Sequence, residues 1–219
     1  MSHPTHAGFI RPPVQCAKQE HEPMLKEQLR RPSGLIGRLV GLFLAHENDE
    51  RIEWAIQQLR IRPEDRVLEI GFGPGDCIEE VAALASCGYV AGVEVSDVMI
   101  EQAHSRNATA IEAGRVDLRK GDVCDLPFEA AQFDKVFTIN SINIWDDEQQ
   151  GLQEIRRVLC EHGTIAIIEH PPSHITERAE IRERGEAIVQ AVKQAGFRAV
   201  RPVYGDLDQG LAVCVHARK

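Results

Sequence analysis

Residues 67 to 76 read Val67-Leu68-Glu69-Ile70-Gly71-Phe72-Gly73-Pro74-Gly75-Asp76. The apolar, branched start of this segment is typical of a buried parallel strand and predicts a strand over residues 66–70. Three glycines at alternate positions then predict a tight turn, and Asp76 can cap a helix over residues 77–85. The segment therefore predicts a strand, a glycine turn and a helix in succession.

The spacing of the three glycines distinguishes between two kinds of ligand. A dinucleotide-binding turn has the pattern G-x-G-x-x-G, with its third glycine where the helix packs on the strand and a pyrophosphate at the helix N-terminus. In this chain Asp76 stands at that third position. Glu69 and Asp76 would place negative charge beside a phosphate, but they would attract a ligand with an ammonium and a sulfonium group. The turn therefore favours a cationic ligand.

Three segments resemble motifs of one enzyme family. The pattern E-x-G-x-G-x-G after a first strand resembles motif I of the class I S-adenosylmethionine-dependent methyltransferases, of the small-molecule, UbiE-like type. Residues 121–128, GDVCDLPF, resemble the family's G-D-x-x-x-L-P-F stretch. Residues 152–159 match its L-x-E-I-x-R-V-L helix and precede Gly163, although residues 160–162 depart from the usual K-P-G turn. The resemblance covers roughly residues 62 to 219.

After the glycine turn, predicted strands and helices alternate, as in a doubly wound sheet with right-handed crossovers. Further strands are predicted over residues 89–95, 115–120, 133–139 and 164–169, and helices over residues 97–107, 147–159 and 173–195. Two final strands, residues 197–204 and 211–216, lie too close in sequence for a helical crossover and must form an antiparallel hairpin. We therefore expect an α/β fold: a Rossmann-like doubly wound seven-stranded sheet with an antiparallel last strand, as the resemblance also implies.

The first sixty residues carry none of these motifs. A loose tail is predicted over residues 1–17, followed by helices over residues 18–31, 35–45 and 49–60, the last capped by Asn48. The apolar helix over residues 35–45 suits either a core helix or a lid over a substrate pocket. We expect an N-terminal tail and helical lid over residues 1–60 and a methyltransferase domain over residues 61–219.

The resemblance implies S-adenosylmethionine as cofactor and S-adenosylhomocysteine as product. The ligand of an open α/β sheet lies at the carboxyl ends of its strands, where Glu94 can accept hydrogen bonds from both ribose hydroxyls. Family position places Asp122 at the adenine amino group, the Val123 N–H at a ring nitrogen and Asn140 near the methionine part. The expected cofactor-binding residues are Glu69, Gly71, Phe72, Gly73, Gly75, Glu94, Val95, Asp122, Val123 and Asn140.

The acceptor side of the site is less well marked. Methyl transfer from a sulfonium needs mainly in-line positioning, but a hydroxyl or ammonium acceptor must also lose a proton. His170, directly after the fifth strand, is the expected catalytic base. His46, Asn143 and Trp145 are expected to bind the acceptor, although Trp145 also suits a packing role. The apolar lid hints at a lipophilic or aromatic small-molecule acceptor.

Composition and charge limit the kinds of partner that the protein is expected to bind. The chain has 219 residues, is 43% apolar and carries a net charge of −9, which argues against binding nucleic acid through phosphates. It has no run of the roughly 18 apolar residues that a membrane span needs, and its start has no signal-peptide pattern, so we expect a cytoplasmic protein. Its six cysteines form no C-x-x-C pair, so we expect reduced thiols and no metal site.

Three alternatives are compatible with parts of the sequence. A NAD-dependent oxidoreductase would share the strand-turn-helix and Glu94. A non-catalytic S-adenosylmethionine-binding module would keep the acids but leave no acceptor cavity. Cys77 resembles a cysteine of arsenite methyltransferases, but the cysteine expected beyond the fourth strand is replaced by Asn140 and Ser141. Nothing in the sequence indicates the oligomeric state.

Overall fold

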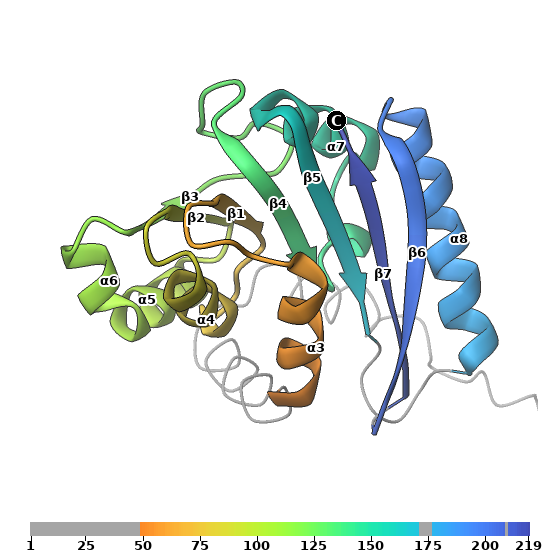
Figure 1. Cartoon of the computed structure of the whole chain (residues 1–219), viewed down its shortest axis with the longest axis horizontal. Coiled ribbons are helices and arrows are strands. Elements are labelled where there is room, and N and C mark those ends of the chain that lie inside the picture. The colour runs from red at the N-terminus through yellow and green to blue at the C-terminus, as the bar shows by residue number, and fades with distance from the viewer. Residues whose placement is uncertain (1–48, 171–176, 209) are drawn as a thin grey trace, which may run out of the picture.

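The computed structural model describes residues 49–170, 177–208 and 210–219, which form a seven-stranded sheet with helices on both faces (Figure 1). The strands are β1 (Arg66–Ile70), β2 (Tyr89–Glu94), β3 (Val116–Lys120), β4 (Phe133–Ile139), β5 (Leu159–Glu169), β6 (Arg198–Leu207) and β7 (Gly210–Arg218). The helices are α3 (Asp49–Leu59), α4 (Asp76–Leu84), α5 (Asp97–Arg106), α6 (Ala108–Glu112), the 3₁₀ turn η1 (Ile142–Ile144), α7 (Glu148–Val158) and α8 (Arg178–Gln194). The predicted tail, the first two helices, Asn48 and His46 lie outside the described residues.

The strand order confirms the predicted topology. The order is β3-β2-β1-β4-β5-β7-β6, with β1 parallel to both β2 and β4. Strand β7 lies between β5 and β6 and is antiparallel to both. The short link between β6 and β7 permits only a hairpin of these two strands. The chain reverses its direction of sheet building between β1 and β4, and a doubly wound sheet opens a ligand crevice at such a point.

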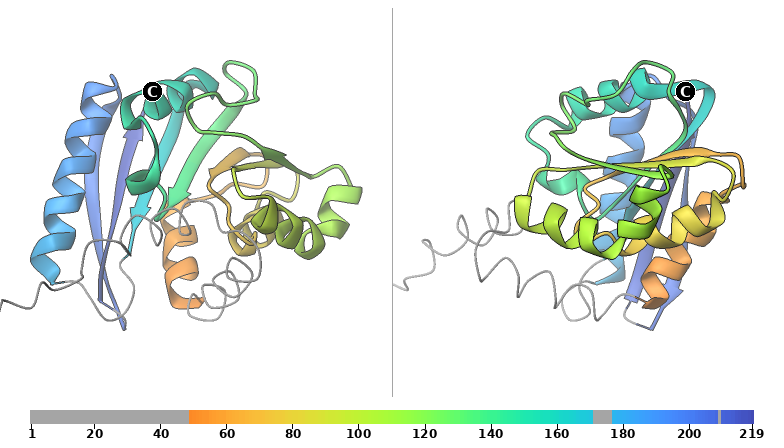
Figure 2. Two further views of the ribbon diagram at one scale, coloured as in Figure 1. Left: turned by 180° about the vertical axis from the view of Figure 1, so that it is seen from behind. Right: turned by 90° about the vertical axis from the view of Figure 1, so that its left-hand side faces the viewer.

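Alternating side chains of the strands build one hydrophobic core on each face of the sheet. Leu68 and Ile70 of β1 join the core under α7 and α8, whereas Val67 joins the core under α3, α4 and α5. In Figure 1 helices α3 to α6 lie on the side toward the viewer, and the view from behind in Figure 2 brings α7 and α8 forward. Strands β3 and β6 are the two edges of the sheet, and on β6 Pro202 and exposed arginines discourage pairing with another sheet.

Three local predictions need correction. Asp76 does not cap α4: the N-cap is Gly75 in a left-handed conformation, and the Asp76 carboxylate pairs with Arg106 at 2.6 Å. The fifth strand begins at Leu159 and not near Gly163, because residues 159–163 are extended and Leu159 already pairs with Phe133 of β4. Helix α6 was not predicted, and it follows α5 directly.

Helix α3 precedes the predicted domain boundary at residue 60, yet it contributes to the main core. Its buried stripe is Ile52, Ala55, Ile56 and Leu59, and these side chains pack beside β4, β5 and α4. The division into a lid over residues 1–60 and a domain over residues 61–219 stays a prediction. No helix within the described ranges is long and apolar enough to cross a membrane.

Candidate active site at the carboxyl edge of the sheet

The glycine loop, residues 71–75, leaves the carboxyl end of β1 beside the crevice. All three of its glycines have positive φ angles of 72°, 52° and 85°, which L-residues adopt only with strain. A Cβ on Gly71 would lie 3.0 Å from Cβ of Ser141, so the loop passes close to the segment after β4. Phe72 is buried over Gly92 of β2. The loop therefore depends on glycine for both its turn and its packing.

Glu94 ties the glycine loop to the end of β2. Its Oε2 accepts a hydrogen bond from Gly73 N at 3.1 Å, and its Oε1 accepts from Val95 N at 2.8 Å and Ser96 N at 2.9 Å. Burial raises the pKa of this carboxyl group, while the three backbone donors oppose the rise. A carboxylate has about four acceptor sites, so Glu94 keeps capacity for a ligand hydroxyl.

Glu69 is a buried acid with one oxygen that no described residue hydrogen-bonds. Only 3% of its surface is exposed, and its Oε2 has no hydrogen-bond partner among the described residues. Burial raises its pKa well above the usual range, and the neighbouring charges of Asp76 and Glu94 raise it further. An unpaired buried acid costs free energy, so a cation placed here would be strongly favoured. This orphaned oxygen fits the ammonium and sulfonium of S-adenosylmethionine and would oppose a pyrophosphate.

The loop over residues 121–128 is held by helix α7. Asp122 Oδ1 accepts from Cys124 N at 2.9 Å, and a carboxylate has about four acceptor sites, so Asp122 keeps capacity for a ligand donor. Arg157 donates to the carbonyls of Phe128 at 2.7 Å and Leu126 at 2.9 Å, and Glu154 accepts from Leu126 N at 3.0 Å. The sequence pattern placed Glu154 and Arg157 on a family helix without indicating this anchoring role.

Asn140 joins the ends of β4 and β5 through His170. Its Oδ1 accepts from the backbone N–H of His170 at 2.8 Å, so its Nδ2 must be the group 2.9 Å from His170 Nδ1. Nδ1 therefore accepts and carries no proton, and neutral His170 is protonated on Nε2. That Nε2 is buried without a partner among the described residues. Burial and the charge of Arg51 lower the pKa of His170 to about 4, so the ring is neutral at pH 7.

Glu169 is a third buried acid at this edge, which the sequence analysis did not single out. Only 3% of its surface is exposed. Its Oε2 accepts from Asn143 Nδ2 at 2.6 Å and lies 3.9 Å from a guanidinium nitrogen of Arg184, whereas its Oε1 has no partner in the described part of the chain. Burial raises its pKa to about 7, against the opposing effects of Arg184 and Asn143.

The other predicted residues have simpler surroundings. Val123 is buried, with its side chain close to Gly151. Trp145 donates its indole N–H to Ser141 Oγ at 3.1 Å and packs on the core, which suits a structural role, and its contact with an acceptor stays a prediction. Burial raises the pKa of the Cys77 thiol, so it is poorly suited to act as a nucleophile. Within the described residues, no cluster of His, Cys, Asp and Glu could hold a metal ion.

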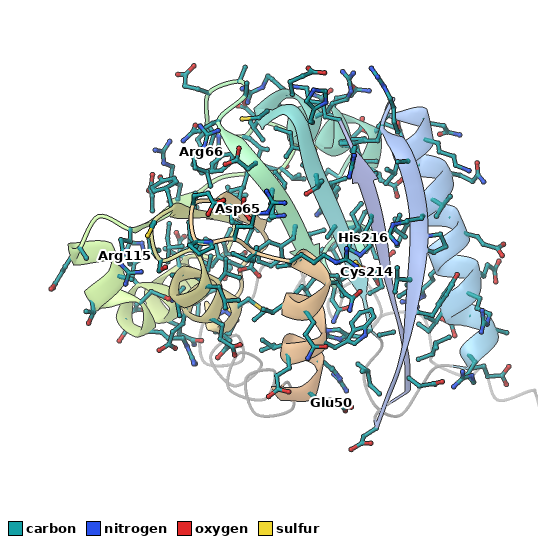
Figure 3. All side chains as sticks on the ribbon, viewed as in Figure 1. Glu50, Asp65, Arg66, Arg115, Cys214 and His216 are labelled. Carbon is teal, nitrogen blue, oxygen red and sulfur yellow. The ribbon has the colours of Figure 1, made fainter. Side chains whose placement is uncertain are left out.

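A cavity of about 760 Å³ opens at the opposite edge of the sheet, where the parallel strands begin. Asp65 and His216, both labelled in Figure 3, line this cavity together with Lys135 and Thr164. It lies at the far end of the strands from the glycine loop and from Glu169. Ligands of open α/β sheets bind at the carboxyl ends, so this cavity is not the donor site.

Comparisons with known proteins agree with this geometry. A family model described as a methyltransferase domain matches residues 67–163. The uncharacterised methyltransferase YdaC of Bacillus subtilis is 30% identical over 83% of this chain and 98% of its own length. The ubiquinone/menaquinone biosynthesis C-methyltransferase UbiE of Geotalea daltonii is 31% identical, over 53% of this chain and 50% of its own length.

A solved structure shows the same fold. The S-adenosylmethionine-dependent methyltransferase from Aquifex aeolicus superposes with a TM-score of 0.64 and 18% identity, over 90% of this chain and 98% of its own. The extended match to YdaC, the methyltransferase-domain model and the antiparallel last strand exclude the dinucleotide-dependent oxidoreductase. The chain therefore belongs to the class I methyltransferases, enzymes that use S-adenosylmethionine as their methyl donor.

Proposed function

We propose that this protein transfers a methyl group to a small-molecule acceptor that binds over the carboxyl ends of β4 and β5. The observation that carries the proposal is the buried Oε2 of Glu69, near the end of β1, which has no partner among the described residues. It marks the donor end of the crevice. We take two hydrogen-bonded pairs at the carboxyl ends of β4 and β5 as the acceptor end: Asn140 with His170, and Asn143 with Glu169.

Each donor-site residue has a distinct role in this proposal. Glu69 offers its charge to the cationic part of S-adenosylmethionine, Glu94 accepts from the ribose hydroxyls, and Asp122 accepts from the adenine amino group. The Val123 N–H faces a ring nitrogen, and Asn140 lies near the methionine part. When bound, S-adenosylmethionine supplies a methyl group that its positive sulfur already activates. The chain therefore has to hold the acceptor in line and keep water out.

His170 serves this reaction best as a hydrogen-bond donor. Its Nδ1 is engaged by Asn140 Nδ2, so the free nitrogen is the protonated Nε2. A base role, as predicted from the position of His170, would require the opposite tautomer. The Nε2–H can instead hold an oxygen of the acceptor or of the donor carboxylate.

The relatives support a small acceptor without identifying it. One relative is named for the biosynthesis of two quinones, ubiquinone and menaquinone, and the chain spans half of its length. A lipophilic or aromatic acceptor is part of this proposal. His46 and Trp145 remain proposed acceptor-binding residues, and His46 lies outside the described residues.

Calorimetry tests the donor site. We expect S-adenosylmethionine and S-adenosylhomocysteine to bind and NADH not to bind. Glu94→Ala should weaken S-adenosylhomocysteine about 10- to 100-fold, because the ribose loses its acceptor and Gly73 N its partner. The exposed Glu112→Ala on α6 is the matched control and should bind as wild type does. Equal affinity of the two variants would show that the ribose is placed wrongly.

Turnover separates an enzyme from a binding module. The protein is incubated with methyl-labelled S-adenosylmethionine and a metabolite extract, and both labelled product and S-adenosylhomocysteine are quantified. We expect both to form in equal amounts. Tight donor binding with no product from any extract would support the non-catalytic module.

A further inference from the structure

Glu169 stands at the carboxyl end of β5, at the edge of the sheet where we place the acceptor. It is the last residue of β5, and it pairs with Val213 of β7 and neighbours the segment η1 through Asn143. One of its oxygens is oriented by Asn143, while the other is buried with no partner among the described residues. An acid that is held at one oxygen and unsatisfied at the other resembles the arrangement of an oriented general base. The unsatisfied oxygen calls for a donor, which a ligand can bring.

His170 is the competing candidate, and its geometry excludes the role of base in the observed tautomer. The Asn140 amide cannot be reversed, because its Oδ1 accepts from the His170 backbone N–H at 2.8 Å. Its Nδ2 therefore donates to Nδ1, and Nε2 already carries the proton. Of these two residues, Glu169 is the one with an acceptor atom that no described residue engages.

We infer that Glu169, and not His170, takes the proton from the methyl acceptor, and that the acceptor is therefore a hydroxyl or ammonium compound. The inference rests on the proposed function, because it concerns the acceptor of that same site. In the step, loss of the X–H proton gives the acceptor oxygen or nitrogen the lone pair that forms the bond to the methyl carbon as the carbon–sulfur bond breaks. The X–H proton passes to Glu169 and afterwards to water, and the donor leaves as a neutral thioether.

The charges around Glu169 suit a base that works near neutral pH. In the described part of the chain, Arg184 of α8 is the cation paired with Glu169, at 3.9 Å, and it also contacts Glu180 at 2.8 Å. From η1 the facing group is the neutral Asn143, from β7 it is Val213, and on β5 the neighbouring His170 is neutral. Because these groups stabilise the negative charge of Glu169 only weakly, burial raises its pKa to about 7. This value is close to the one that favours proton transfer at neutral pH.

The first experiment measures rate against pH. Wild type, Glu169→Gln and Glu169→Asp are compared with labelled S-adenosylmethionine and four probes: catechol, a primary amine, a tertiary amine and a thioether, plus a metabolite extract. We expect the wild-type rate to rise through about pH 7 and then level, because Glu169 must be ionised. Glu169→Gln should lower kcat by about 100-fold or more and lose this rise, and Glu169→Asp should recover part of the rate.

Two controls separate the proposed role from a structural one. Glu183→Gln changes an exposed acid of the same helix α8 that does not pair with Arg184 or Glu169, and it should leave both rate and pH profile unchanged. The Kd for S-adenosylhomocysteine should stay within about twofold in every variant, because Glu169 lies outside the donor site. Infrared difference spectra of wild type and Glu169→Gln across pH 5 to 9 should show one carboxyl band that disappears near pH 7, without any acceptor present.

The outcomes are distinct. Full activity of Glu169→Gln, a profile that is flat above pH 5, or transfer only to the tertiary amine and thioether would each overturn the inference. A carboxyl band that titrates near pH 4.5 would also do so. Donor binding without transfer to any probe or extract would show that the proposed function itself fails, and the inference would fall with it.

Discussion

Replacing Gly75 by alanine tests how the glycine loop is held. Gly75 has a φ of 85°, and a left-handed conformation costs an L-residue about 1 to 2 kcal/mol. The new Cβ would lie 2.7 Å from Cβ of Ala103 and 2.8 Å from Nδ2 of Asn107, and overpacking of this kind costs about 1 to 3 kcal/mol. We therefore expect Gly75→Ala to lower the free energy of unfolding by about 2 to 5 kcal/mol.

Gly73→Ala is the matched control within the same loop. Gly73 also has a positive φ, 52°, but its Cβ would meet nothing within 4 Å. Only the backbone cost of about 1 to 2 kcal/mol applies, so the difference between the two variants measures the contact with α5. The open space beside Gly73 is where we place the donor. Gly73→Ala should therefore weaken S-adenosylhomocysteine at least tenfold while it remains folded.

Urea unfolding followed by circular dichroism gives the two free energies, and calorimetry gives the affinities. A domain of this size shifts its melting temperature by about 2 to 4 °C per kcal/mol, so Gly75→Ala should melt about 4 to 20 °C lower. Equal destabilisation by the two substitutions would refute the packing argument. Wild-type affinity in Gly73→Ala would refute the placement of the donor.

Three further substitutions probe the rest of the site. Asp122→Ala should weaken S-adenosylmethionine by about 1 to 3 kcal/mol in calorimetry, the cost of an unpaired polar group, with the melting temperature unchanged. Arg157→Ala should weaken the same ligand by a similar amount and also lower the melting temperature, because the 121–128 loop loses its anchor. Glu169→Gln should equal wild type in stability near pH 4.5 and exceed it by about 3 kcal/mol above pH 7, as urea unfolding would show.

The sign of the last prediction follows from linkage. The pKa of Glu169 is about 7 in the folded protein and near 4.5 when unfolded, so its contribution to stability is complete below pH 4.5. It is lost as the pH rises toward 7, because the buried carboxyl group must then ionise. Glutamine does not titrate and escapes this loss. Parallel pH dependence of the two proteins would contradict the raised pKa.

The sheet was predictable from sequence because its strands are continuous apolar runs. The predicted boundaries of β1 and β4 match the observed ones, and the short link before β7 correctly required the hairpin. The early start of β5 was not predictable, since residues 160–162 are polar and become extended only through pairing with β4. Backbone hydrogen bonds to a neighbouring strand override local composition in such a segment.

The prediction that Asp76 caps α4 was wrong for a different reason. Aspartate before a helix usually caps it, but the Asp76 carboxylate is drawn to Arg106 at the end of α5, 30 residues away in sequence. No local pattern reports that contact. For the same reason, the roles of Arg157 and Glu169 could not be predicted from sequence. They depend on which carbonyls and amides the fold brings beside these side chains. Glu69 and Glu94 could be singled out from sequence because they stand near the carboxyl ends of predicted strands, and their roles stay predictions.

Three buried glutamates at one edge of the sheet differ in how far the protein compensates their charge. Glu94 receives three backbone N–H donors, Glu169 receives one amide and a distant guanidinium, and no described residue donates to Oε2 of Glu69. Burying a carboxylate without hydrogen-bond or charge partners lowers the stability of the fold, so a ligand must supply the missing partners. The lack of partners is largest at Glu69, and this suits a cationic ligand group. The lack of partners is small at Glu94, and this suits neutral hydroxyl groups. It is intermediate at Glu169, and this suits a ligand group that gives up a proton.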